Sequence, residues 1–260
     1  MGFFDYPYYD DLEPEAVPVF FVQLVLVIGA LFFTIGMFKR WLKRKKRPAL
    51  LLFLSFLTFT VAIGMFAFAI GSAILAGLKK EIPYMIGLGS FYTLMGVANI
   101  PLMLFASDVF EIDFKYLRKY IILDIGTVLL CALPNNYYGV SEDLQTLFSI
   151  RLYSTLMLLV TCVLIYSRIY SNAMHASKRT HDPHARLAFK YIAYSQISFI
   201  VSYIFGLLDT ITFEFTDATG YTFFNYLMWV SAGFFFMFCY LGYIMPEWLK
   251  NRIDRKQRGF

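Results

Sequence analysis

The chain has 260 residues, of which 59% are hydrophobic and 20% are aromatic, and its formal net charge is +5. An apolar share this high exceeds what a soluble domain of this length can bury, so the composition excludes an ordinary soluble protein. The positive charge forms no basic stripe on a soluble domain, so we expect no nucleic-acid partner.

Seven apolar runs follow one another along the chain, separated by short polar stretches. They cover residues 17–38, 49–78, 83–107, 120–134, 146–167, 191–213 and 221–245. Most can cross a bilayer as a helix, which takes about 20 apolar residues. The pattern predicts an all-α membrane protein with a seven-transmembrane helix bundle at 17–245. An acidic tail (1–16) precedes the bundle, and a short interfacial helix with a basic tail (246–260) follows it.

The distribution of positive charge orients this bundle. If every run crosses the membrane, the polar stretches between the runs lie alternately on its two sides. All but three of the 23 Lys and Arg residues then fall on one side, and the exceptions are Lys79, Lys80 and Arg151. Loops rich in Lys and Arg stay on the cytoplasmic side of a membrane. The first 16 residues are acidic and contain neither Lys nor Arg. We therefore predict a multi-pass plasma-membrane protein with its N-terminus outside and its C-terminus in the cytoplasm.

The second run carries small residues on one helical face. They are Thr60, Gly64, Ala67 and Gly71. Small side chains let two helices approach closely within lipid, so we expect this face to contact another helix. If the face were exposed, it would be a docking surface for another subunit.

Asp124 lies within the fourth run, on one face with Thr127 and Cys131. A charge at membrane depth is costly unless it has a partner, so an intramembrane carboxylate is treated as a functional hypothesis. We expect Asp124 to bond Lys119 or a neighbouring tyrosine, and a proton-carrying role is the alternative.

Polar residues line one face of the sixth run, and hydroxyls facing hydrocarbon are unfavourable, so this face is predicted to point into the bundle. They are Tyr191, Ser195, Ser198, Ser202, Gly206 and Asp209. Asp209 and Arg151 of the fifth run fall at a similar depth near the outer face. We predict that they pair and bound a ligand pocket that receives Tyr153, Asn225 and Trp229.

Two alternatives to this pocket remain open at the level of the sequence. Arg151 and Asp209 lie near the ends of their runs, where long side chains can reach the headgroups instead of pairing. The hydroxyl of Ser202, which we place among the ligand-binding residues, can also bond its own helix, as serines in membrane helices commonly do.

The segment after the last run begins at Pro246 and continues with Trp248 and Leu249. Pro at the first helical position and apolar residues on one side predict a short interfacial helix. We expect Trp248 and Leu249 to bind a cytoplasmic partner, and a passive membrane anchor is the alternative.

The motifs of several enzyme and cofactor classes are absent. The sequence has no nucleotide-binding loop, no HExxH or GxSxG run and no dinucleotide fingerprint, so we expect no enzyme of these classes. A bound retinal needs a lysine in the seventh run, and none occurs between Lys190 and Lys250. His175, His181 and His184 are irregularly spaced among positive charges, which opposes metal binding. We predict neither a metal nor a cofactor.

Seven aromatic-rich runs, an outside N-terminus and the ending Tyr240-Leu-Gly-Tyr-Ile-Met-Pro-Glu-Trp-Leu249 carry a resemblance. The whole chain resembles the seven-helix sensory module of archaeal and bacterial histidine kinases. In that family the last span leads into cytoplasmic signalling domains, whereas 15 residues follow Met245 here. The resemblance implies a stand-alone sensor, or a subunit that signals through a separate partner.

These observations predict a prokaryotic, archaeal-type receptor that binds a small or lipidic ligand in the bundle and signals to a cytoplasmic partner. One alternative is a small transporter or permease, in which Asp124 and Asp209 lie along a route lined by Ser195, Ser198 and Ser202. Another is a structural subunit of a membrane complex.

Overall fold

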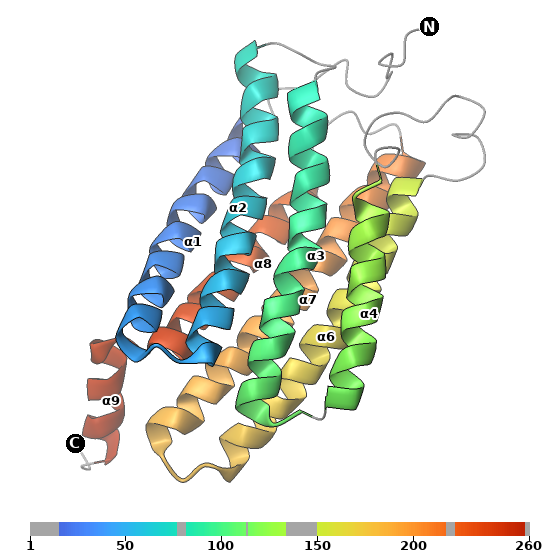
Figure 1. Ribbon diagram of the computed structural model, residues 1–260. Coiled ribbons are helices and arrows are strands. Elements are labelled where there is room, and N and C mark those ends of the chain that lie inside the picture. Colours follow the sequence, from blue (N-terminus) through green and yellow to red (C-terminus); the bar gives the residue numbers. More distant parts are fainter. Residues whose placement is uncertain (1–15, 77–81, 113, 134–149, 217–221, 258–260) are drawn as a thin grey trace, which may run out of the picture.

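The computed structural model describes residues 16–76, 82–112, 114–133, 150–216 and 222–257, and all regular structure in these ranges is helical. The elements are α1 (Ala16–Arg44), α2 (Arg47–Ala76), α3 (Ile82–Phe110), α4 (Phe114–Cys131), α6 (Ile150–Arg179), α7 (Pro183–Phe215), α8 (Phe223–Cys239), the π-helix η3 (Tyr240–Ile244) and α9 (Glu247–Gln257). Helices α1 to α4 and α6 to α8 run up and down side by side, and α1 begins at the end of the bundle opposite to α9 (Figure 1).

Within the described ranges, six helices are long and apolar enough to cross a membrane, namely α1, α2, α3, α6, α7 and α8. Their outward side chains are large and apolar, with Val25 69% and Phe32 72% exposed. Such surfaces are stable in lipid and unfavourable in water. The chain is therefore an all-α membrane helical bundle, as the composition predicts.

Helix α4 is not among these six, although it packs between α3 and α6. Four of its 18 residues are of charged types, namely Lys115, Arg118, Lys119 and Asp124. A helix of that length spans about 27 Å, close to the thickness of the hydrocarbon core. The seventh crossing, and with it the outside N-terminus, stays a prediction.

Two helices extend well beyond the predicted apolar runs. The runs end at residue 167 and resume at 191, whereas α6 continues to Arg179 and α7 already begins at Pro183. Asp182 caps α7 by accepting hydrogen bonds from the backbone N–H groups of His184 and Ala185, at 3.1 and 3.2 Å. A capping Asp followed by Pro is a strong helix start that hydropathy alone does not register.

The small-residue face of α2 packs against α1, which confirms that it contacts another helix. The hydroxyls of Thr34 and Thr60 are 2.9 Å apart. A Cβ atom on Gly71 would lie 2.8 Å from the ring of Phe20, so a larger residue there would displace this ring. Ala67 is only 3% exposed. Helix α1 therefore contacts this face at Thr60 and Gly71, and only the part around Gly64, where a Cβ would meet nothing within 4 Å, is open to another subunit.

Candidate functional site

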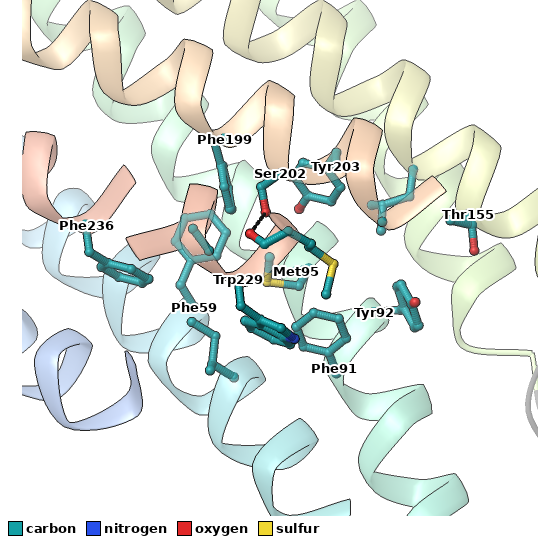
Figure 2. Close-up of a pocket in the computed structure, with 15 residues that line it drawn as sticks. Phe59, Phe91, Tyr92, Met95, Thr155, Phe199, Ser202, Tyr203, Trp229 and Phe236 are labelled. Carbon is teal, nitrogen blue, oxygen red and sulfur yellow. Dashed lines mark hydrogen bonds between the residues drawn. The ribbon is translucent and has the colours of Figure 1, made fainter. Parts of the chain in front are cut away.

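A cavity of about 40 Å³ lies between α2, α3, α6, α7 and α8 (Figure 2). Its walls are mainly aromatic and aliphatic side chains, and Met95 and Met228 are among them. One water needs about 10–15 Å³, so the space suits only a small group unless side chains move. Methionine adapts its shape readily, so these two residues let the cavity accept a larger molecule.

Aromatic rings fix the width of the cavity. Trp229 is 2% exposed, and the centre of its ring lies 5.4 Å from the ring centre of Phe66 and 6.0 Å from that of Phe91. On another wall, Phe199 stacks on Phe235 with ring centres 4.1 Å apart. Aromatic pairs in such arrangements stabilise a core beyond the burial of their area. These walls are therefore rigid compared with the two methionines.

The carboxylate of Asp209 in α7 accepts hydrogen bonds from residues at the start of α8. The Thr222 hydroxyl donates to Asp209 Oδ1 at 2.6 Å, and Asn225 Nδ2 donates to Asp209 Oδ2 at 3.0 Å. Trp229 Nε1 in turn donates to Asn225 Oδ1 at 3.1 Å. Thr222 is also the N-cap of α8. Asp209 is thus connected through Asn225 to a tryptophan that lines the cavity.

The predicted pocket is assembled in part. Asp209 and Asn225 bond each other, Trp229 lines the cavity, and Ser202 lines it while donating to the Met228 carbonyl at 2.9 Å (Figure 2). Tyr153 is 46% exposed and does not line the cavity, so its placement there was wrong. The side chain of Arg151 lies outside the described residues, and its pairing with Asp209 stays a prediction.

Asp124 has a different partner from the one expected. Its side chain is fully buried, and Oδ1 accepts a hydrogen bond from Asn99 Nδ2 of α3 at 2.9 Å. Asn99 Oδ1 accepts a hydrogen bond from the Tyr166 hydroxyl of α6. Oδ2 of Asp124 has no hydrogen-bond partner in the structure. Of the two expected partners, Lys119 was wrong, because it is on an exposed face of α4, and a tyrosine, Tyr166, is reached only through Asn99.

The serine face of α7 is used mainly by its own helix. The fully buried Ser195 donates to the Ile192 carbonyl at 2.7 Å, and Ser198 donates to the Tyr194 carbonyl at 3.1 Å. Neither residue lines the cavity. The expected polar route along Ser195, Ser198 and Ser202 is therefore not continuous, because only Ser202 reaches the cavity.

The end of α8 is held to its neighbours before α9 begins. The Arg40 guanidinium of α1 donates to the carbonyls of Tyr243 and Ile244 at the end of η3. Met245 then has a φ of 47°, which turns the chain into α9. Leu249 is 4% exposed and anchors α9, whereas Trp248 is 58% exposed. The two residues predicted to bind a partner therefore face different environments.

A hydrogen bond between side chains connects α9 to the start of α7. His184 Nε2 lies 2.8 Å from Asp254 Oδ1. The histidine cluster was predicted to be a solvated loop, but His184 belongs to the first turn of α7. Its contact connects the two elements at the Lys- and Arg-rich end of the bundle.

Sequence reasoning missed Asn99 and Tyr166, which complete the Asp124 site. Charged residues within the apolar runs were the signal for a candidate site, whereas Asn99 is a neutral amide. It lies in the middle of the third run and is fully buried. An amide at that depth also needs partners, so it was a usable signal. Comparisons of the chain with protein-family models, curated proteins and solved structures found no match.

Proposed function

We propose that the chain is a receptor-like plasma-membrane sensor, which binds a small or lipidic ligand in the cavity and signals to a separate cytoplasmic partner. One observation carries the proposal. Helix α8 lines the cavity with Met228, Trp229, Ala232 and Phe236, and continues through η3 toward α9. A single element thus connects the candidate ligand site to the end of the bundle that is rich in Lys and Arg.

A ligand can act on α8 only if it binds two conformations unequally. Trp229 is suited to sense the ligand because it lines the cavity and is fixed from behind by Asn225 and Asp209. Displacement of Trp229 would strain this chain of hydrogen bonds and move α8 against α7. The carbonyls held by Arg40 would then shift, and α9 would present a different surface to the partner.

Native mass spectrometry of the gently extracted protein tests ligand binding. The wild-type chain is expected to carry a non-covalent small molecule. Ala232 is 5% exposed and lines the cavity, so Ala232→Leu fills the site and should remove that molecule. Thermal unfolding of the variant serves as the control, because a leucine that overfills the site would destabilise the bundle and only a folded variant tests the proposal. An identical adduct in the folded variant would place the ligand elsewhere and contradict the proposal.

A permease remains the second candidate, and the fully buried Asp124 with its unpartnered oxygen favours it. Intramembrane carboxyls of this kind occur on ion and proton pathways. Flux assays in liposomes separate the two functions. A receptor should move no solute or proton at a rate above that of protein-free vesicles, whereas a permease should lose flux on Asp124→Asn.

A further inference from the structure

The cavity of the proposed sensor has a shape and polarity that restrict its ligand, and this inference rests on the proposed function. Its lining runs along α7 from Phe199 to Gly206 and along α8 from Met228 to Phe236. Seven and eight helical steps correspond to about 10 and 12 Å. With a volume of about 40 Å³, the space is long and narrow. A single chain fits it better than a fused ring system.

One end of the cavity carries a hydroxyl that lacks a partner. Thr155 of α6 is 6% exposed and lines the cavity, and its Oγ1 is buried with no hydrogen bond in the structure. Other helical threonines differ, because Thr58 and Thr210 each donate to the carbonyl four residues before them, at 2.9 and 3.0 Å. A buried hydroxyl without a partner is destabilising by about 1–3 kcal/mol. A ligand oxygen beside Thr155 would remove that penalty.

The two ends of the cavity differ in chemistry. Figure 2 shows Thr155 and Tyr92 at one end and Phe236 at the other. Among the residues that the structure describes, the lining includes no Lys, Arg, Asp or Glu, so an ionised headgroup held by these residues would be buried without a counter-charge, which is strongly unfavourable. The polar group of the ligand is therefore neutral.

We infer that the cavity takes a neutral single-chain amphiphile, such as a long-chain alcohol or amide. Its polar end exchanges hydrogen bonds with the Thr155 hydroxyl, and its chain extends between Trp229 and Phe199 toward Phe236. The side chains of Met95 and Met228 move aside to make room for the chain.

The test uses the full chain in lipid nanodiscs, with 1-decanol as the probe and thermal unfolding as the readout. Decanol should raise the unfolding temperature saturably, whereas decanoate, which is ionised, and cyclododecanol, which is a ring, should not. Thr155→Val removes the hydroxyl at nearly constant volume and should weaken decanol binding about fivefold, since a neutral hydrogen bond contributes about 1 kcal/mol. Thr155→Ser should retain binding.

Two controls separate the outcomes. Thr212→Val removes a hydroxyl that bonds its own helix at Leu208 and should leave decanol binding unchanged. Ala232→Leu should abolish the saturable shift, which distinguishes the cavity from partition into the lipid. Suppose that Ala232→Leu removes the co-purified molecule. If decanol and decanoate then act alike, or if Thr155→Val binds decanol like the wild type, the ligand class is wrong and the sensor proposal stands. If Ala232→Leu changes neither readout, both fail.

Discussion

The buried polar residues of this bundle act in groups rather than singly. Asn99 is bonded on both sides of its amide, to Asp124 through Nδ2 and to Tyr166 through Oδ1. It thereby joins α3, α4 and α6. In an apolar interior, such a network is stabilising only when its members have hydrogen-bond partners. Removal of one member leaves the others buried without that partner. Asn99 is therefore the central residue of the group.

Substitution of Asn99 should be much more harmful than the closest substitution of Asp124. Asn99→Leu leaves a carboxyl and a phenol buried without this partner, so we expect the free energy of unfolding to fall by about 2–4 kcal/mol. Asp124→Asn keeps an oxygen that accepts from Asn99 and should change it by less than about 1 kcal/mol. Denaturant unfolding in detergent micelles, followed by circular dichroism, measures both values.

The double variant Asn99→Leu/Asp124→Leu provides the control. With the amide and the carboxyl both gone, part of the loss should be recovered, because apolar replacement of both members of a pair is close to neutral, while the Tyr166 hydroxyl still lacks its Asn99 partner. Equal losses for Asp124→Asn and Asn99→Leu would show that the network does not depend on Asn99.

The sequence predicted that Asp124 is an intramembrane carboxylate that needs a partner, and the residue is fully buried beside one. It did not identify the partner. Helical spacing fixes which residues share a face, as it did for Asn225 and Trp229, but not how far one helix slides along the next. Asn99 and Asp124 meet because α3 and α4 pack closely. The close packing is seen at Gly96, where an added Cβ atom would lie 2.6 Å from a methyl group of Val128.

At the scale of elements, the end of α8 is closely constrained by neighbouring helices. A Cβ atom on Gly242 of η3 would lie 2.8 Å from Ile192 Cγ1 and 3.1 Å from the Ala188 carbonyl oxygen. This contact between η3 and α7 lies next to the carbonyls that Arg40 holds. The stretch after the cavity is therefore fixed against two helices, which suits it to pass on a displacement of α8.

Gly242→Ala should disrupt this connection, because the new methyl group overlaps side-chain and backbone atoms of α7. We expect a loss of about 1–3 kcal/mol in the free energy of unfolding. Gly126→Ala is a matched control, since a Cβ there meets nothing within 4 Å and the substitution favours the helix by about 0.5–1 kcal/mol. Similar stabilities for the two variants in denaturant unfolding would argue against the close approach of η3 and α7.

The two residues predicted to bind a partner should behave differently. Leu249→Ala removes the buried anchor of α9, so a spin label at Asn251→Cys should become more mobile. Trp248→Ala, which changes an exposed side chain, should leave the label unchanged while weakening partner binding in co-purification. The native cysteines are buried, so the introduced one is labelled selectively. Equal mobility in both variants would show that Leu249 does not anchor α9.

Apolar runs predicted the existence and order of the helices better than their ends. The first three runs agree with α1 to α3 at most ends, because lipid contact requires apolar residues along most of the helix. The last turns of α6 and the first turns of α7 are polar, and only the Asp182-Pro183 pair marks that helix start. At the junction of α8 and η3, Cys239 is fully buried, whereas Tyr240 is 41% exposed.

For the whole molecule, the charge asymmetry and the helix count must agree. An odd number of crossings places α1's first residue and α9 on opposite sides of the membrane, and they do lie at opposite ends of the bundle (Figure 1). If those ends lie on opposite sides of a membrane, α4 must cross it as well, and this crossing stays a prediction. The basic residues of α4 lie in its first two turns, at the same end as the other basic loops, so its remaining turns are apolar apart from the buried Asp124.

Single cysteines test the seventh crossing and the orientation together. In intact cells, a membrane-impermeant maleimide should label Leu133→Cys, just after α4, and Phe223→Cys at the start of α8, which are 47% and 70% exposed. Tyr116→Cys, near the start of α4, and Arg252→Cys in α9 should react only after permeabilisation, because positive loops stay in the cytoplasm. The wild-type chain, with buried cysteines, is the unlabelled control. If Leu133→Cys and Tyr116→Cys react alike, α4 does not cross; if the two pairs exchange behaviour, the bundle is inverted and α9 cannot contact a cytoplasmic partner.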